Sequence, residues 1–166
     1  EQGGIEKPII ATIGDSTFFH AGLPPLVNAV HQNYNINIIV MDNRVTAMTG
    51  QQDSPSTDTN LLGKKSKVIK PEKIAEAIGV DFVEVLNPYK KEESQKTIED
   101  ALNHKGVSFI VMRAPCALWK PREEYLTIDK ETCISCDICL NETGCPALHK
   151  EDEKMQIKQD ICIGST

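Results

Sequence analysis

The sequence predicts an α/β fold with a parallel sheet, followed by a smaller cysteine-rich module. Short apolar runs alternate with helical segments over the first two thirds of the 166 residues, a pattern typical of strand–helix–strand units in parallel sheets. Five of the six cysteines lie beyond residue 120. We therefore expect two domains, one over residues 1–120 and a second over residues 121–166.

Strands and helices are expected to alternate through the first domain. The apolar run 8–13 predicts the first strand, and Gly14-Asp15 leads from it into a helix around 21–32. Pro71 opens a short helix that Gly79 ends, following the usual preference for proline first and glycine last. The other expected elements are strands at 36–42, 80–86 and 107–113 and a charged surface helix at 90–104.

Three further segments are expected to be irregular or short. Residues 43–67 are polar and rich in Thr, Ser, Gly and Gln, which predicts a long loop, and loops of this length are often functional. Residues 114–124 have the composition of a linker. In the cysteine-rich module we expect short strands near 125–129 and 154–158.

Charge and hydropathy exclude several classes of function. The net charge is −6, which argues against a nucleic-acid partner. Residues 121–166 carry 5 basic and 10 acidic groups, so the excess of acid lies with the cysteines. No apolar stretch is long enough to span a membrane and no secretory signal is visible, which favours a cytoplasmic protein. The chain starts at Glu1 rather than Met, so we expect a fragment of a longer polypeptide.

Two polar motifs stand where two neighbouring strands should end. Gly14-Asp15-Ser16 follows the first strand, and Asp42-Asn43 follows the second after twenty-five intervening residues. Ligands of parallel sheets bind beyond the carboxyl ends of the strands. A carboxylate, an amide oxygen and a main-chain carbonyl can share one Mg²⁺ that also carries phosphates. Taken alone, Gly-Asp-Ser would more often be an ordinary strand-to-helix turn; the second motif makes the cation site the better interpretation.

The cysteine spacing is the second strong signal. Cys133, Cys136 and Cys139 are each separated by two residues, and Cys145-Pro146 follows after five more. Three closely spaced cysteines with a later Cys-Pro are typical of a [4Fe–4S] cluster, although the common bacterial run has three residues in the last gap. A zinc site and disulfides are the alternatives. The single continuous run disfavours zinc, and the missing secretory signal disfavours disulfides.

Cys162 is expected to be the first ligand of a second cluster motif. In two-cluster ferredoxins the fourth cysteine of each run serves the other cluster. Cys145 would then belong with Cys162, and the first cluster would keep only three cysteines from this chain. We therefore expect little intact cluster in these 166 residues alone.

The two strand-end motifs resemble the thiamine diphosphate motif, whose usual form is Gly-Asp-Gly, some 25 residues, then Asn-Asn. The fuller runs around Gly14 and Asn43 resemble the 2-oxoacid:ferredoxin oxidoreductases, and among them the indolepyruvate branch, over nearly the whole chain. The resemblance implies a partial thiamine diphosphate-binding fold followed by a truncated ferredoxin-like α+β iron–sulfur domain.

Site residues carried over from the resemblance centre on a Mg²⁺ ion. Asp15 and Asn43 would be its ligands, with the main-chain carbonyl of Val45 as a third, and Gly14 and Ser16 would approach the cofactor. Ser16 replaces the usual Gly and Asp42 the usual first Asn, but neither is the implied metal ligand. Weaker candidates are His20, as an acid or hydrogen-bond donor, and three loop residues that could meet the diphosphate or substrate: Thr46, Thr49 and Gln51.

The resemblance also implies an activity and its partners. The reaction would be oxidative decarboxylation of an aryl 2-oxoacid to an acyl-CoA, with electrons passing through [4Fe–4S] clusters to ferredoxin. Coenzyme A and a beta subunit of the same enzyme would be partners. The chain has no pyrimidine-binding domain with its activating glutamate, so we expect no turnover by this chain alone. Alternatives are pyruvate or 2-oxoglutarate as substrate, a non-catalytic iron–sulfur electron-transfer module, and a zinc-binding interaction protein.

Overall fold

The structure is a computed structural model that describes residues 7–116, 126–162 and 164. The chain divides into two compact units, residues 1–116 and 117–166. Residues 114–116 are irregular, and the rest of the expected linker lies outside the described residues. No helix among the described residues is long and apolar enough to cross a membrane.

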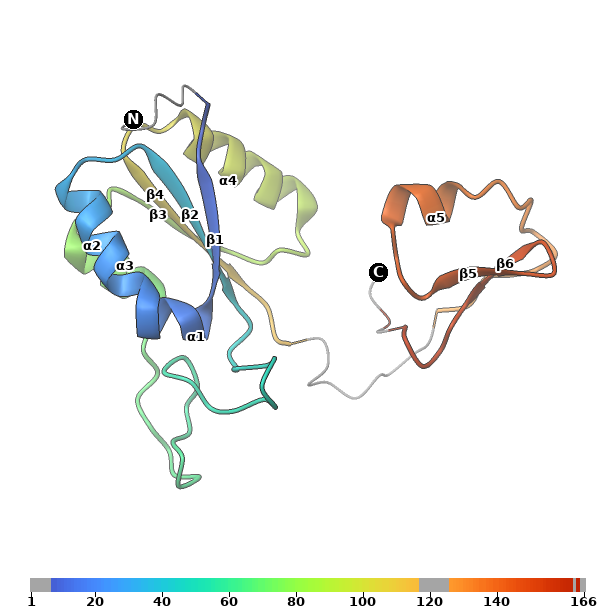
Figure 1. The fold of residues 1–166 in the computed structure, drawn as a ribbon, viewed down its shortest axis with the longest axis horizontal. Coiled ribbons are helices and arrows are strands. Elements are labelled where there is room, and N and C mark those ends of the chain that lie inside the picture. Colours follow the sequence, from blue (N-terminus) through green and yellow to red (C-terminus); the bar gives the residue numbers. More distant parts are fainter. Residues whose placement is uncertain (1–6, 117–125, 163, 165–166) are drawn as a thin grey trace. The chain divides into compact units, whose positions relative to one another are not determined.

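A four-stranded parallel sheet forms the centre of the first unit (Figure 1). The strands run in the order β1-β2-β4-β3, so β1 and β2 are neighbours. Because Gly14 pairs with Met41, the residues that follow β1 and β2 leave the sheet at the same edge. The strands are β1 (Ile10–Gly14), β2 (Ile36–Asp42), β3 (Phe82–Leu86) and β4 (Val107–Arg113).

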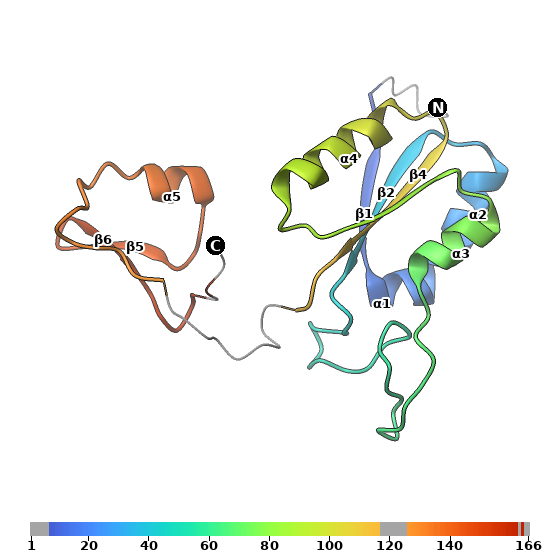
Figure 2. The ribbon, with the colours of Figure 1, turned by 180° about the vertical axis from the view of Figure 1, so that it is seen from behind.

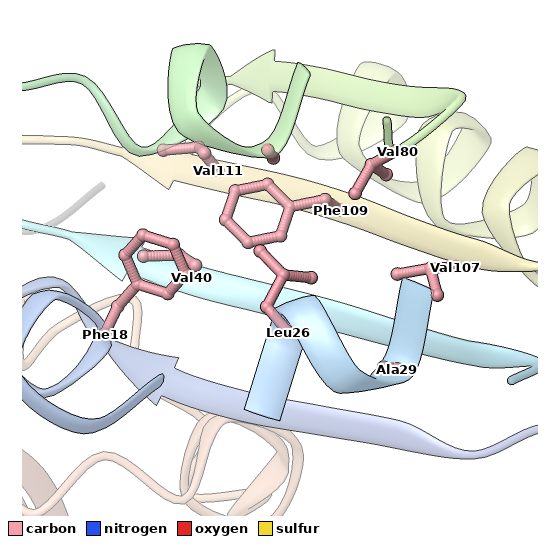
Figure 3. Packing of buried hydrophobic residues seen from close by; sticks show 9 residues of the cluster. Phe18, Leu26, Ala29, Val40, Val80, Val107, Phe109 and Val111 are labelled. Atoms are coloured by element: carbon pink, nitrogen blue, oxygen red, sulfur yellow. The ribbon is translucent and has the colours of Figure 1, made fainter. Parts of the chain in front are cut away.

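Helices cover both faces of this sheet (Figures 1 and 2). Helices α2 (Leu23–His31) and α3 (Pro71–Ile78) lie on one face, and α4 (Lys91–Asn103) lies on the other. On the first face Phe18, Leu26 and Phe109 pack together in the larger apolar cluster (Figure 3). Ile39, Ile110 and Ala101 belong to the smaller cluster beneath α4. Alternate residues of β2 and β4 thus serve opposite faces, as the two-residue period of a strand requires.

The helical segment after β1 begins earlier than the sequence suggests. Helix α1 (Asp15–Thr17) starts at once, a π-helical turn spans Phe18–Gly22, and α2 follows. Pro24 and Pro25 lack an N–H to donate to carbonyls four residues back, which disfavours a regular α-turn there and favours a widened one. A Cβ on Gly22 would lie 2.9 Å from Ile13, so glycine lets this turn pack closely on β1.

The other elements of the first unit lie close to their predicted positions. Helix α3 begins at Pro71, and Gly79 ends it with a φ of 98°. Residues 43–70 carry only isolated bridges, which confirms the long loop.

A buried ion cluster joins β2, β4 and α3. Nε of Arg113 donates to Oδ2 of Asp42 (2.6 Å), and its two terminal nitrogens donate to the Glu72 carboxylate (3.1 and 2.7 Å). Asp42 and Glu72 are 1% and 6% exposed. Burial opposes ionisation of Glu72, but the hydrogen bonds from Arg113 hold its pKa below the ordinary value of 4.5. The cluster links the carboxyl ends of β2 and β4 to α3 through charge-assisted hydrogen bonds.

The lowered pKa of Glu72 predicts an acid-dependent loss of stability. Because the folded protein binds this proton less readily than the unfolded chain, the stabilisation is present above pH 4.5 and is lost as pH falls through the folded-state pKa. Chemical denaturation of the full chain between pH 3 and pH 7 should show this loss. Glu72→Gln should be less stable at pH 7 and show a weaker pH dependence. Parallel pH curves for the two proteins would contradict the assignment.

The second unit contains a hairpin and one short helix. Strands β5 (Leu148–Glu151) and β6 (Lys154–Ile157) pair antiparallel, and α5 (Ile138–Thr143) precedes them. Met155 is buried at its centre. The strand expected near 154–158 is confirmed, but residues 126–129 form no strand. The carbonyl of Leu126 accepts a hydrogen bond from the side chain of Gln159 (3.0 Å), a side-chain contact in place of a strand ladder.

Candidate active site

Asp15 is a buried carboxylate at the carboxyl end of β1. It is 3% exposed, although it directly follows a strand end. Its Oδ1 accepts the N–H of Ser16 (2.8 Å), and its Oδ2 accepts the hydroxyl of Ser56 (2.9 Å). The bond to Ser56 spans 41 residues of sequence. A residue of the long loop is therefore hydrogen-bonded to the first strand-end motif.

A tight serine–threonine turn carries Ser56 to this position. The hydroxyls of Ser54 and Ser56 lie 2.8 Å apart, and the Thr57 hydroxyl donates to the carbonyl of Ser54 (2.7 Å). All three residues are buried. The carbonyl of Pro55 accepts the N–H of Ile69 (2.8 Å), which ties the turn to the end of the loop. Sequence reasoning missed this turn; its signal is the run Ser54-Pro55-Ser56-Thr57, typical of a hydroxyl-bonded turn.

The second motif forms its own turn at the end of β2. Oδ1 of Asp42 accepts the N–H of Arg44 (3.1 Å), and Oδ1 of Asn43 accepts the N–H of Val45 (3.1 Å). Arg44 has a φ of 63°, unusual for a residue other than glycine. Val45 is buried at 1% exposure. The structure thus places Asn43 and Val45 at the strand end next to the one that Asp15 follows.

Asp15 has a raised pKa, and burial is the main cause. Burial raises the pKa above its ordinary value of 3.8, and the negative charge of neighbouring Asp42 adds to the rise, while hydrogen bonds from Ser16 and Ser56 oppose it. Arg113 forms ion pairs with Asp42 and Glu72. Within the described residues, no Lys, Arg or His forms an ion pair with Asp15. A buried carboxylate lacking a cationic partner is a suitable ligand for a metal ion.

The surroundings of Asp15 fit a cation that carries phosphates. A Cβ built on Gly14 would meet no atom within 4 Å, so open space lies beside the strand end. Carboxylate, amide and carbonyl oxygens are available from Asp15, Asn43 and Val45, which are the oxygen ligands that Mg²⁺ prefers. Asp15 and Asn43 each bind a neighbouring N–H, and an oxygen with two lone pairs can accept that bond and still coordinate a cation.

Two of the weaker candidates, His20 and Thr49, form no hydrogen bond with the proposed cation ligands among the described residues. His20 is exposed, and its Nδ1 donates to the carbonyl of Ser16 (2.7 Å). Thr49 is also exposed and donates to Oε1 of Gln52 (2.5 Å), whose Nε2 donates back to the Thr49 carbonyl (2.6 Å). No described hydrogen bond joins His20 or Thr49 to Asp15 or Asn43. Their roles remain predictions.

The cysteines of the second unit are free thiols, and they are not gathered into one centre. All six cysteines are unpaired, so none of them forms a disulfide. Within residues 7–116 and 126–162, no group of three or more His, Cys, Asp or Glu side chains is placed to hold a metal ion. Cys145 and Cys162 nevertheless line the same apolar hollow, of about 450 Å³.

Cys133 has surroundings that favour a thiolate. Backbone N–H groups of Met155 and Ser135 lower the pKa of its thiol, and the charge of Lys154 adds to this. Nζ of Lys154 also donates to the Cys133 carbonyl (2.6 Å). Ser135 and Asp137 have φ values of 57° and 59°, so the chain turns sharply between successive cysteines. Thiolates are the form in which cysteine binds metals.

Known proteins match this chain at two levels. Residues 3–112 match the family model described as "Thiamine pyrophosphate enzyme, C-terminal TPP binding domain". Indolepyruvate oxidoreductase subunit IorA of Archaeoglobus fulgidus is 43% identical over 96% of this chain and 27% of that protein. IorA of Pyrococcus horikoshii is 44% identical over 98% of the chain and 26% of that protein. The chain thus spans about a quarter of the length of these relatives.

A more distant relative and a solved structure agree with the fold. The 2-oxoglutarate synthase subunit KorB of Archaeoglobus fulgidus is 25% identical over 67% of the chain and 44% of that protein. A 2-oxoglutarate:ferredoxin oxidoreductase from Magnetococcus marinus superposes with a TM-score of 0.56, at 21% identity, over 62% of this chain and 38% of that one. The chain therefore belongs to the thiamine pyrophosphate enzymes, through their C-terminal TPP binding domain, and it is similar to indolepyruvate oxidoreductase subunits over nearly its whole length.

Proposed function

We propose that this chain supplies the Mg²⁺ and diphosphate site of a 2-oxoacid:ferredoxin oxidoreductase that acts on aryl 2-oxoacids of the indolepyruvate type. The observation that carries the proposal is Asp15, a buried carboxylate that forms no ion pair with any described residue and is held by Ser56 beside the turn of Asn43. The names of the relatives support the same reaction class and substrate.

Each residue of the site would have a defined task. Asp15, Asn43 and the Val45 carbonyl would hold the cation, and Gly14 would leave room for the diphosphate. The Ser56 hydroxyl bond would fix the Asp15 carboxylate in one orientation before the cation arrives. When bound, thiamine diphosphate would supply the chemistry that cleaves the bond between the keto carbon and the carboxylate. The protein's contribution is binding and orientation.

The second unit would carry electrons away from this site. Cys133, Cys136 and Cys139 would hold three irons of a [4Fe–4S] cluster. Cys145 and Cys162 would serve a second cluster, which is supported by the hollow they share. The lowered pKa of Cys133 favours the thiolate that such ligation needs. Coenzyme A would take up the acyl group, and ferredoxin and a beta subunit would be protein partners.

Cofactor binding by the complete enzyme tests this proposal. Titration calorimetry with thiamine diphosphate should show binding with Mg²⁺ and loss of that binding with EDTA. Reduction of a viologen dye, followed with indolepyruvate, pyruvate and 2-oxoglutarate in turn, should be fastest with indolepyruvate. Absence of cofactor binding would overturn the site, whereas a preference for pyruvate would overturn only the aryl substrate.

The same measurements distinguish the proposed function from the two alternatives that the sequence alone allowed. A non-catalytic electron-transfer module would contain iron and bind no thiamine diphosphate. A zinc-binding interaction protein would be colourless and contain zinc. Metal analysis together with an absorbance spectrum of the anaerobically prepared enzyme separates both from the proposed function.

A further inference from the structure

We propose that Arg113 is a positioning residue for the cation site, acting through Asp42 on the turn that presents Asn43 and Val45. This inference rests on the proposed function, because it assigns Arg113 a task in the same site. Arg113 itself lies on β4, 71 residues from Asp42 in the sequence.

Three hydrogen bonds hold the Arg113 guanidinium in a fixed position. Asp42 and Arg113 are direct partners in the parallel ladder of β2 and β4. Nε of Arg113 binds Asp42, while the two terminal nitrogens bind both oxygens of Glu72, in the first turn of α3. The side chain of Arg113 is 20% exposed, and the side chains of Asp42 and Glu72 are 1% and 8% exposed. A planar guanidinium held by three hydrogen bonds has little freedom to move.

Asp42 connects this guanidinium to the turn at the end of β2. With Oδ2 bound to Arg113, Oδ1 of Asp42 is directed to the N–H of Arg44. That bond stabilises the positive φ of Arg44, and the reversal brings the Val45 N–H to the side chain of Asn43. The Asp42 carbonyl also accepts the N–H of Ala114, next to Arg113. The orientation of the Asn43 amide and the Val45 backbone thus depends on how Asp42 is held.

Arg113 also makes the charge at this edge of the sheet uneven. Asp15 and Asp42 follow neighbouring strands, and both are buried. Arg113 forms ion pairs with Asp42 and Glu72, whereas Asp15 has none among the described residues. A divalent cation arriving at this edge therefore meets Asp15 as a buried carboxylate that no described ion pair neutralises. Without the guanidinium, Asp42 would compete with Asp15 for the cation.

Two substitutions break the connection between Arg113 and the turn, one at Arg113 and the other at Asp42. Arg113→Lys keeps the charge but cannot bind both carboxylates with a planar fork. Asp42→Ala removes the acceptor for the Arg44 N–H. In the complete enzyme, each should weaken Mg²⁺-dependent binding of thiamine diphosphate about tenfold, as expected for contacting residues in one network. The double variant should bind no more weakly than Asp42→Ala alone, because both changes act along one path.

Glu72→Gln is the matched control. It removes the charge of Glu72 on the side away from the turn, but the amide oxygen of Gln can still accept one N–H of Arg113, so the guanidinium stays tethered and keeps its bond to Asp42. It should lower the unfolding temperature by an amount similar to Arg113→Lys, yet change cofactor affinity less than about threefold. Calorimetry measures affinity and thermal unfolding measures stability, so the two effects separate.

The outcomes decide between positioning and a merely structural role. The inference would be overturned if Arg113→Lys or Asp42→Ala folded and bound thiamine diphosphate with wild-type affinity. An equal loss of affinity in Glu72→Gln would also overturn it. If either Arg113→Lys or Asp42→Ala does not fold, the cofactor affinity of the other variant tests the inference. Failure of the wild-type enzyme to bind thiamine diphosphate would instead overturn the proposed function.

Discussion

Asp15→Asn is expected to lower the affinity of the complete enzyme for thiamine diphosphate with Mg²⁺ by about 10- to 100-fold, and to raise the stability of the cation-free protein. The affinity falls because a charge-assisted contact worth roughly 1.5–3 kcal/mol is lost. The stability rises because burial raises the pKa of Asp15, so its ionised form is less stable in the folded than in the unfolded protein at neutral pH.

The shape of Asn suits this experiment. Its amide oxygen can still accept the N–H of Ser16, and its NH₂ group can donate to the Ser56 hydroxyl, so the local geometry is retained. Titration calorimetry with and without Mg²⁺ gives the affinity. Thermal unfolding in EDTA should show a rise of about 2–4 °C, typical of relieving a destabilised functional group.

Asp58→Asn is the control, because it makes the same chemical change at an exposed aspartate of the same loop. This substitution should change neither the affinity for thiamine diphosphate nor the unfolding temperature in EDTA. Affinity of Asp15→Asn equal to wild type would contradict the role of Asp15 as a cation ligand. A fall in unfolding temperature in EDTA would show instead that the ionised carboxylate stabilises the fold.

Cys136→Ser in the complete enzyme is expected to uncouple cofactor binding from electron transfer. The substitution removes a thiolate ligand of the proposed first cluster, and even outer-shell changes at metal sites reduce affinity or activity by about 10–100-fold. Iron content should fall by one cluster, and dye reduction should fall by at least about tenfold. Binding of thiamine diphosphate should persist, because its proposed contacts are with Asp15 and Asn43 in the other unit.

Cys116→Ser provides the matched control, since Cys116 is a free thiol of the first unit and lies outside the cysteine run. Iron analysis, the absorbance spectrum and viologen reduction should all match wild type. If Cys136→Ser kept full iron content and dye reduction, the module would not be on the electron path. Parallel loss of cofactor binding would show that the substitution disturbs the whole protein.

The spacing of the cysteines predicts which residues are ligands but does not predict how the structure arranges them. The spacing of Cys133, Cys136 and Cys139 predicts ligands for one cluster, but the described structure gathers no such centre. What it adds is the hollow shared by Cys145 and Cys162 and the N–H groups that favour a Cys133 thiolate. The strand predicted near residue 125 is wrong for residues 126–129, because pairing depends on a neighbouring strand that a short apolar run does not specify.

By itself, the sequence determined the alternation of strands and helices, the long loop, and the placement of Asp15 and Asn43 at two adjacent strand ends. These follow from local periodicity and from the rule that parallel strands end at one edge. Only the tertiary structure decided that Ser56 binds Asp15 across 41 residues and that Arg113 binds Asp42 across 71. The physical reason is that these contacts depend on the path of an irregular loop and on strand order, and neither leaves a periodic signal in the chain.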